Sequence, residues 1–210
     1  MGDDADAVSR AVDDRVDEQA FLDALEIAVS ALERADVPYM VIGGLASAVY
    51  GRPRWTHDID LFVKPEDARR ALHALADAGF VTEETNPHWI FKAWRDGAVI
   101  DLIFCVKGDI YVDEEMLSRS RVAEIKGRRA RVLPPEDLVV IKAIVHDEPS
   151  ARHWHDALGV IAGTELDWEY LLRRAPRGAR RVLSLLLYAQ ASDLVVPEGA
   201  IRDLFATIYG

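Results

Sequence analysis

The chain has 210 residues, half of which are hydrophobic, and carries a formal net charge of −11. This length and composition are enough for a folded protein with a real hydrophobic core, in one large domain or two small ones. The acidic balance argues against a protein that coats nucleic acid without sequence preference, because such binding depends on neutralising phosphates with basic side chains.

The sequence shows no sign of export or of membrane contact. Its single cysteine, Cys105, cannot form an internal disulfide and lies in the apolar run VIDLIFCV, so we expect a buried thiol in a reducing compartment. No apolar run approaches the length that spans a bilayer, and the first residues, MGDDADAVSR, lack the basic and apolar regions of a signal peptide. The sequence therefore predicts a cytoplasmic protein with no membrane partner.

Predicted helices and strands alternate in the first half of the chain. Apolar residues at helical spacing predict an amphipathic helix over residues 17–35. Pro65, followed by two acidic residues, starts a helix that ends at residue 78. Asp96-Gly97 is a hairpin-turn signal between two strands. The other expected elements are strands over 39–42, 59–63, 80–83, 88–95 and 98–106 and a short helix over 45–50. This alternation indicates one mixed sheet flanked by helices.

The second half becomes almost entirely helical after Pro134-Pro135. A short helix over residues 111–118 and a hairpin over 122–133 come first. Beyond the two prolines, apolar residues at helical spacing predict helices over 136–145, 151–161, 167–174, 179–191 and 198–208. We therefore predict an α+β fold in two parts: a mixed core with an N-terminal helix over residues 1–133, and an all-helical C-terminal domain over residues 134–210.

Three aspartates stand inside apolar strands of the predicted core. Asp58 and Asp60 alternate with apolar residues in the stretch HDIDLF, and Asp101 interrupts the apolar run AVIDLIF. Side chains two residues apart on a strand point to the same face, so the paired aspartates can converge on a cation. Aspartate is depleted in strands and costly to bury unless it is paired or bound to a metal. The three carboxylates therefore predict a site for a hard cation such as Mg²⁺, the alternative being that Asp101 pairs with a neighbour such as Arg95.

A glycine pair precedes the paired aspartates in the stretch IGGLASAVYGRPRWTHDIDLFV. Gly43 and Gly44 end one strand and open a helix, so their backbone N–H groups are free at a helix N-terminus, with no Cβ in the way of a phosphate. Ser47 adds a hydroxyl in the first turn of that helix. The glycine turn, taken together with the aspartates that follow, predicts a nucleotide-phosphate site.

The same stretch resembles the signature of the nucleotidyltransferase (DNA polymerase beta-like) superfamily, in which a Gly-Gly or Gly-Ser turn precedes paired aspartates and a third aspartate follows on a later strand. Within it, the chain is similar to small bacterial AbiEii-type toxin nucleotidyltransferases and their uncharacterised relatives, since Gly51, Arg54 and Thr56 lead into the paired aspartates. The later stretch LPPEDLVVIKAIVHDEPSARHWHDALGVI resembles the same type, with His155-Asp156 where relatives often have Lys-Asp. The likeness covers residues 38–162. Lincosamide and aminoglycoside adenylyltransferases share the glycine and aspartate pattern.

The resemblance implies a role for each of the three aspartates. Asp58 and Asp60 would bind Mg²⁺, as two ions, and Asp101 would complete the metal site. All three would be catalytic residues, because metal ions on both sides of a reacting phosphate stabilise the attacking and the leaving oxygen. Asp101 would also take the proton of the attacking hydroxyl.

The resemblance also implies a donor site. Gly43, Gly44 and Ser47 would bind the triphosphate of the NTP donor, such as ATP, and Lys142 would contact its phosphates. The implied protein is an enzyme that moves a nucleoside monophosphate from the NTP to a hydroxyl acceptor. The sequence leaves the acceptor, the preferred base and the roles of His155 and Asp156 open.

Three functions compete. An RNA acceptor, such as the 3′ end of tRNA for a toxin with a partner antitoxin, would use the basic stretches over residues 119–131 and 173–181. A small hydroxylated molecule, as in antibiotic adenylyltransferases, would use an acidic or aromatic pocket instead. A non-catalytic nucleotide-binding or antitoxin-like module is disfavoured, because it has no need of three costly carboxylates. Basic stretches that lie away from the cleft would favour the small molecule.

Overall fold

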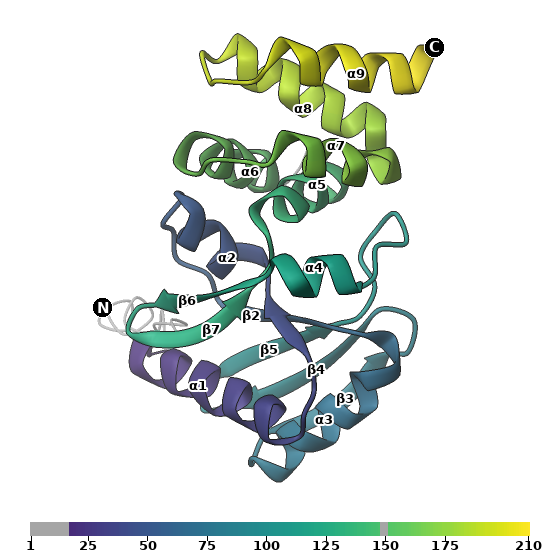
Figure 1. Cartoon of the computed structure of the whole chain (residues 1–210). Helices are drawn as coiled ribbons and strands as arrows, with labels where there is room; N and C mark the ends of the chain where they lie inside the picture. Colours follow the sequence, from purple (N-terminus) through teal and green to yellow (C-terminus); the bar gives the residue numbers. More distant parts are fainter. Residues whose placement is uncertain (1–16, 148–150) are drawn as a thin grey trace, which may run out of the picture.

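The computed structural model describes residues 17–147 and 151–210. They form one mixed sheet flanked by helices, and the chain ends in a helical part (Figure 1). The predicted α+β fold is therefore confirmed. Residues 1–16, on which the prediction of no export signal rests, lie outside the described residues. Among the helices of the described residues, none combines the length and the apolar character that a bilayer crossing requires.

Seven strands form the sheet, in the order β3-β4-β5-β2-β1-β7-β6. Their bounds are Tyr39–Val41 (β1), Asp58–Val63 (β2), Val81–Asn86 (β3), Ile90–Arg95 (β4), Ala98–Ile103 (β5), Arg121–Ile125 (β6) and Arg128–Val132 (β7). The pairs β2/β5 and β1/β7 are parallel, and the other neighbours are antiparallel. The strands that carry the predicted site aspartates, β2 and β5, are therefore direct neighbours inside the sheet.

Two tight turns set the register of the strand pairs that they connect, β4 with β5 and β6 with β7. Asp96 and Gly97 join β4 to β5 with φ angles of 49° and 83°, the left-handed conformation that the predicted Asp-Gly turn requires. Lys126 and Gly127 join β6 to β7 in the same way, with φ angles of 48° and 84°. The first turn pairs Arg95 with Ala98 and so fixes every further pair between β4 and β5.

Two helices pack side by side against the sheet, α1 (Glu18–Arg34) and α3 (Ala68–Asp77), as Figure 1 shows. The Asp17 carboxylate caps α1 by accepting a hydrogen bond from the Ala20 backbone N–H at 3.1 Å. The apolar residues at helical spacing are the buried ones, with Leu25, Ala28 and Leu32 wholly inaccessible to solvent. The predicted amphipathic helix is thus seen with its apolar face on the core.

Several predicted elements differ at their ends; β3, for example, runs to Asn86 and not to the expected residue 83. Helix α4 (Glu114–Arg119) begins three residues after the expected start at 111, because the Asp113 side chain accepts from the Met116 N–H at 2.9 Å and caps the helix there. Strand β5 ends at Ile103, not at the expected residue 106. Beyond it the chain turns through Gly108 and Asp109, both of which have positive φ.

Five further helices form the C-terminal part: α5 (Pro135–Val145), α6 (Arg152–Gly163), α7 (Trp168–Arg174), α8 (Ala179–Ala191) and α9 (Glu198–Tyr209). Figure 1 shows them stacked at one end of the molecule, above the helix α2 (Gly43–Tyr50) that follows β1. Buried side chains of α5 and α8, such as Leu138 and Leu185, belong to the same hydrophobic core as Leu61 of the sheet. The division into two domains at residue 133 stays a prediction.

Candidate active site

The three predicted aspartates lie together in the middle of the sheet. Asp60 and Asp101 stand directly opposite each other on the parallel neighbours β2 and β5, and Asp58 lies on the same face, two residues before Asp60. One carboxylate oxygen from each residue lies within 4.8 Å of the others, as ligands of a shared cation do. The sheet register thus brings these carboxylates to one place.

The charges of this cluster repel one another. Burial, together with repulsion from Asp58 and Asp101, raises the pKa of Asp60 to about 7, against the opposing charges of Lys142 and Lys92. Mg²⁺ binds through a few carboxylates and fills its remaining positions with water or phosphate oxygens. A divalent cation among three carboxylates would replace this repulsion by attraction, so the residues present fit a metal site.

The carboxylates of Asp58 and Asp101 each accept a hydrogen bond from a neighbouring side chain. The Thr56 hydroxyl donates to Asp58 Oδ1 at 2.6 Å. Lys92 Nζ donates to Asp101 Oδ1 at 2.5 Å and forms an ion pair with it. Arg95, the partner considered for Asp101 from the sequence, instead donates to a backbone carbonyl at the end of α3, at 2.7 Å. The ion pair of Asp101 with a lysine of β4 was not predicted.

The glycine turn lies against the aspartates. Helix α2 begins at Gly43. Both glycines line the same cavity as Asp58, Asp60 and Asp101, which together form the acid cluster. A Cβ on Gly43 would lie 1.7 Å from Asp60 Oδ2, and a Cβ on Gly44 would lie 2.9 Å from Thr56 Oγ1. The glycines therefore leave room for the side chains of Asp60 and Thr56, and a Cβ is absent where a ligand could approach the helix N-terminus.

Ser47 lies deeper than the sequence suggested. Its side chain is fully buried, and its hydroxyl donates to the Gly43 carbonyl, one turn back in α2, at 2.8 Å. Serine often makes this bond inside helices, where it competes with other partners. Ser47 does not line the cavity. Its role in phosphate binding stays a prediction that requires the hydroxyl to change partners.

Replacing Gly43 by alanine tests how closely the turn and the acid cluster are coupled. Gly43 and Gly127 have positive φ angles of 65° and 84°, so alanine at either position carries backbone strain of about 1 kcal/mol. Only at Gly43 would the new Cβ meet Asp60, since nothing lies within 4 Å of a Cβ on Gly127. We expect Gly43→Ala to lower the melting temperature more than Gly127→Ala. Thermal unfolding with Mg²⁺ and a non-hydrolysable NTP should show ligand stabilisation in Gly127→Ala alone, and equal stabilisation of both variants would contradict this coupling.

Asp156, whose role the sequence left open, binds three cationic side chains. Lys142 Nζ lies 2.8 Å from Asp156 Oδ2. Arg54 donates to both oxygens of Asp156, from Nε to Oδ1 at 2.9 Å and from Nη2 to Oδ2 at 3.0 Å. Arg52 Nη1 adds a contact of 2.6 Å to Oδ1. Arg54 and Lys142 also line the cavity of the acid cluster. The buried carboxylate on α6 thus holds together α5, α6 and the loop before β2, and it fixes two cations beside the predicted metal site.

Burial and charge act in opposite directions on this network. Burial alone would raise the pKa of Asp156, but hydrogen bonds from Arg54 and Lys142 and the charge of Lys142 lower it to about 2. Burial lowers the pKa of Lys142, and Asp156 opposes that change. Neighbouring His155 is exposed on α6 and lines no part of the cavity. Of the His155-Asp156 pair, therefore, only Asp156 contacts residues that line the cavity, namely Arg54 and Lys142.

The cavity that holds these groups has a volume of about 620 Å³. Away from the acid cluster its wall is mixed. The apolar lining residues are Trp89, Ile90, Ile103, Cys105, Val106 and Val145, and the charged or polar ones are Lys107, Asp109, Arg152 and His153. Cys105, expected to be buried, is half-buried and lines this wall, because the chain turns away from the sheet after β5. The cavity thus combines charged groups, which suit phosphates, with apolar side chains that suit a ring or an aliphatic group.

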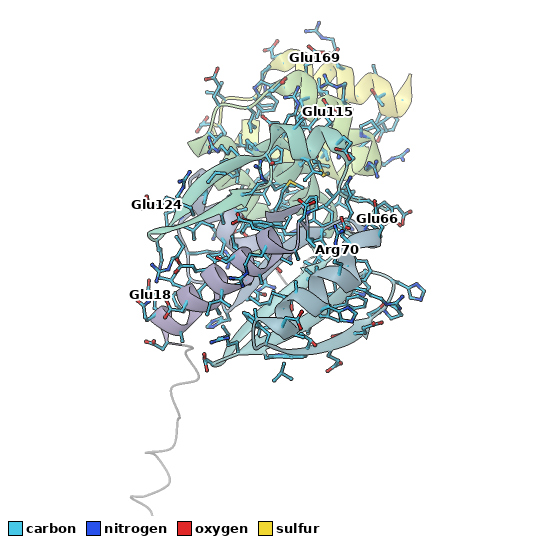
Figure 2. All side chains as sticks on the ribbon, turned by 60° about the horizontal axis from the view of Figure 1, so that its bottom comes forward. Glu18, Glu66, Arg70, Glu115, Glu124 and Glu169 are labelled. Atoms are coloured by element: carbon cyan, nitrogen blue, oxygen red, sulfur yellow. The ribbon has the colours of Figure 1, made fainter. Side chains whose placement is uncertain are left out.

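The two basic stretches that RNA would need lie outside this cavity. No arginine of residues 119–131 or 173–181, all of which the structure describes, lines its wall. Acidic neighbours neutralise several of them. Arg173, for example, forms ion pairs with Glu115 and Glu169, at 2.9 and 3.1 Å. Figure 2 labels these two glutamates, which lie on α4 and α7. The two stretches therefore contribute no cation to the cavity wall, and part of their charge is already neutralised.

Comparison with known proteins agrees with this geometry. Residues 8–193 match the model of a protein family described as uncharacterised nucleotidyltransferase. This match confirms the resemblance to the nucleotidyltransferase superfamily that the sequence predicted. No curated protein matches the chain at a significant level.

Solved structures share the fold at low sequence identity. The antibiotic-resistance factor ANT(2'')-Ia in solution has a TM-score of 0.51 at 16% identity, covering 89% of this chain and 94% of that one. Its crystal structure with adenylyl-2''-tobramycin also has a TM-score of 0.51, at 17% identity, covering 81% and 97%. An antigenic nucleotidyltransferase-like protein from Paracoccidioides brasiliensis has a TM-score of 0.55 at 14% identity, covering 90% and 94%. At these identities the likeness establishes a common fold.

Proposed function

We propose that this chain, which belongs to the family of uncharacterised nucleotidyltransferases, is an active enzyme that transfers a nucleoside monophosphate from an NTP to a hydroxyl group of a small molecule. The observation that carries this proposal is the convergence of Asp58, Asp60 and Asp101 in one cavity with the glycine turn. Three costly carboxylates without a metal would only destabilise the fold, so a non-catalytic module is a poorer account of them.

Different residues of the cavity would bind the metal ion and the phosphates of the NTP. Asp58, Asp60 and Asp101 would hold Mg²⁺, which when bound places positive charge beside the reacting phosphate oxygens. The N–H groups at the start of α2, at Gly43 and Gly44, would bind phosphate oxygens. Arg54 and Lys142, the two cationic side chains that Asp156 holds, line the same cavity. They would add positive charge for the triphosphate.

The proposed reaction exchanges one bond to phosphorus for another. The acceptor oxygen forms a bond to the α-phosphorus, and the bond from that phosphorus to the bridging oxygen of the leaving group breaks. Pyrophosphate leaves with the electron pair of the broken bond. Asp101, which lines the cavity, would take the proton of the acceptor hydroxyl.

The surroundings of the cavity support a small acceptor over RNA. The arginines of residues 119–131 and 173–181 lie outside its wall, and several are already ion-paired. The apolar lining side chains, Trp89 among them, suit a molecule with a ring or an aliphatic face. A tRNA-modifying toxin with an antitoxin partner is the alternative. The neighbour that carries an adenylylated antibiotic shares only the fold, so it does not identify the acceptor.

The test of this proposal follows the label of the transferred nucleotide. The protein is incubated with Mg²⁺ and each α-labelled NTP, first with cellular RNA and then with the small-molecule fraction of a cell extract. We expect label in a small molecule, with release of pyrophosphate. Label in RNA would instead support the toxin-like alternative, and no labelled product from any NTP would argue against an active transferase.

A triple variant separates the two acceptors further. Replacing Arg128, Arg129 and Arg131 by glutamine removes three cations from the first basic stretch, and its turnover with a small acceptor should stay within about twofold of the parent because these arginines lie outside the cavity. If RNA is the acceptor, the slope of log affinity against log salt should instead flatten by roughly one unit for each phosphate that the variant ceases to neutralise. Melting temperatures of parent and variant serve as the control, since Arg128 also contacts Asp23 and Glu26 at 2.9 and 2.8 Å.

A further inference from the structure

A lysine stands in line with the acid cluster across three neighbouring strands. Lys92 of β4 is directly opposite Asp101 of β5, and Asp101 is directly opposite Asp60 of β2. Side chains of directly opposed residues lie on the same face of a sheet. The Lys92 ammonium and the carboxylates of Asp101 and Asp60 therefore form a row across β4, β5 and β2. Lys92 lies at the end of this row that is farthest from Asp58.

This lysine is held against the cluster by an ion pair. Lys92 Nζ lies 2.5 Å from Asp101 Oδ1, and the two side chains are 31% and 15% exposed. On the other side of the cluster, the Thr56 hydroxyl occupies Asp58 Oδ1 at 2.6 Å. One oxygen of Asp58 and one of Asp101 therefore already accept a side-chain hydrogen bond, and the other oxygen of each remains for a cation.

We propose that this site binds a single divalent cation, and that the Lys92 ammonium supplies the positive charge that a second ion would bring next to Asp101. The inference rests on the proposed function, since it concerns the metal of that reaction, and it replaces the two ions that the sequence resemblance implied. A second divalent ion at Asp101 would lie within a few ångströms of the ammonium, where like charges repel strongly in a partly buried site. A single ion among the three carboxylates meets the ammonium only across Asp101.

Lys92 acts in this scheme as a positioning residue, because it contacts Asp101 and no part of the reacting groups. Its bond fixes Oδ1 and leaves Oδ2 of Asp101 for the cation or for the proton of the acceptor hydroxyl. A purely structural role for the ion pair would not change how many cations the site binds. The number of bound ions is therefore the readout that separates the two roles.

The test counts Mn²⁺ bound to the full chain together with a non-hydrolysable α,β-methylene ATP, from the electron paramagnetic resonance signal of free Mn²⁺. The affinity of Mn²⁺ for the nucleotide alone is measured without protein, and an ion that the protein binds more tightly than the nucleotide alone is counted as an ion of the site. We expect a single ion per parent chain. Lys92→Met should gain a second ion, bound at least about tenfold more tightly than any second ion of the parent, because the repelling charge is gone.

Two further variants serve as matched controls. Lys92→Arg keeps the cation beside Asp101, so it should bind a single ion. Lys64→Met removes the same charge from an ion pair with Glu114, outside the cavity, and should also bind a single ion.

Each outcome decides a different point. Two ions on the parent, with affinities that Lys92→Met leaves unchanged, would overturn this inference and leave the proposed transferase intact. No ion on either protein would remove the metal site and the proposed function together. Should Lys92→Met fail to fold, the counts for the parent and for Lys92→Arg still decide, because two ions on both would refute a single-cation site.

Discussion

Replacing Asp58 and Asp60 together by asparagine is expected to abolish nucleotidyl transfer, with a loss of at least about a thousandfold. The two side chains keep their size but lose the charges that would hold the metal, and Asp101 alone cannot hold the ion. Transfer of label from the preferred NTP measures the loss. The matching control, Asp77→Asn with Asp203→Asn, removes two exposed carboxylates outside the cavity and should keep full activity.

The same double variant should lose its response to ligand. A ligand that binds only the native protein raises the free energy of unfolding by about 2.7 kcal/mol at a hundred times its Kd. We expect Mg²⁺ with a non-hydrolysable NTP to raise the melting temperature of the parent and to leave that of the double variant unchanged. An undiminished shift in the double variant would remove these two aspartates from the metal site.

Without ligand, the double variant should be at least as stable as the parent at neutral pH. Burial, with repulsion from Asp58 and Asp101, raises the pKa of Asp60 to about 7. A carboxyl whose pKa is higher in the folded state binds its proton more tightly there, so the parent loses stability as the pH rises from about 4 through 7. The asparagine variant lacks this loss. Melting temperatures across that range, without metal, should therefore fall more steeply for the parent.

Much of the site could be predicted from local sequence patterns. The glycine pair, the paired aspartates and Asp101 each interrupt an apolar run, and that contrast is visible without a structure. The partner of Asp101 was predictable in principle as well. The Asp96-Gly97 turn fixes the register of β4 and β5, and counting back from that turn pairs Lys92 with Asp101. The sequence interpretation considered Arg95 instead, which lies beside the turn and bonds elsewhere.

The Asp156 network could not be predicted in this way. Its partners Arg52, Arg54 and Lys142 come from two other parts of the chain, and no local pattern encodes how α6 packs against them. Ser47 shows a different limit. A hydroxyl in the first turn of a helix can serve a ligand or the helix carbonyl one turn back, and here it bonds the carbonyl. Sequence patterns name the available groups, whereas tertiary packing decides which partners they meet.

Replacing Asp156 by asparagine is expected to lower the free energy of unfolding by about 3 kcal/mol, because removing one member of a buried ion network leaves its partners uncompensated. The buried charge of Lys142 accounts for most of the expected loss. Its side chain is only 4% exposed, and Asp156 is the carboxylate that now pairs with its ammonium. Chemical unfolding measures the loss. As a control, Glu84→Gln breaks the exposed pair with Arg69 and should change stability little.

Adding Lys142→Met to Asp156→Asn tests the cause of this loss. If the loss comes from the uncompensated ammonium, removing that charge should restore part of the stability, and the two changes should not add. The dependence on pH gives an independent check. With the pKa of Asp156 lowered to about 2 by Arg54 and Lys142 against the effect of burial, its contribution is complete above about pH 4 and is lost as the pH falls towards 2. The parent should therefore lose its advantage over Asp156→Asn in that acidic range, and a constant difference across it would show that the charge of Asp156 is not what holds α6 to the metal site.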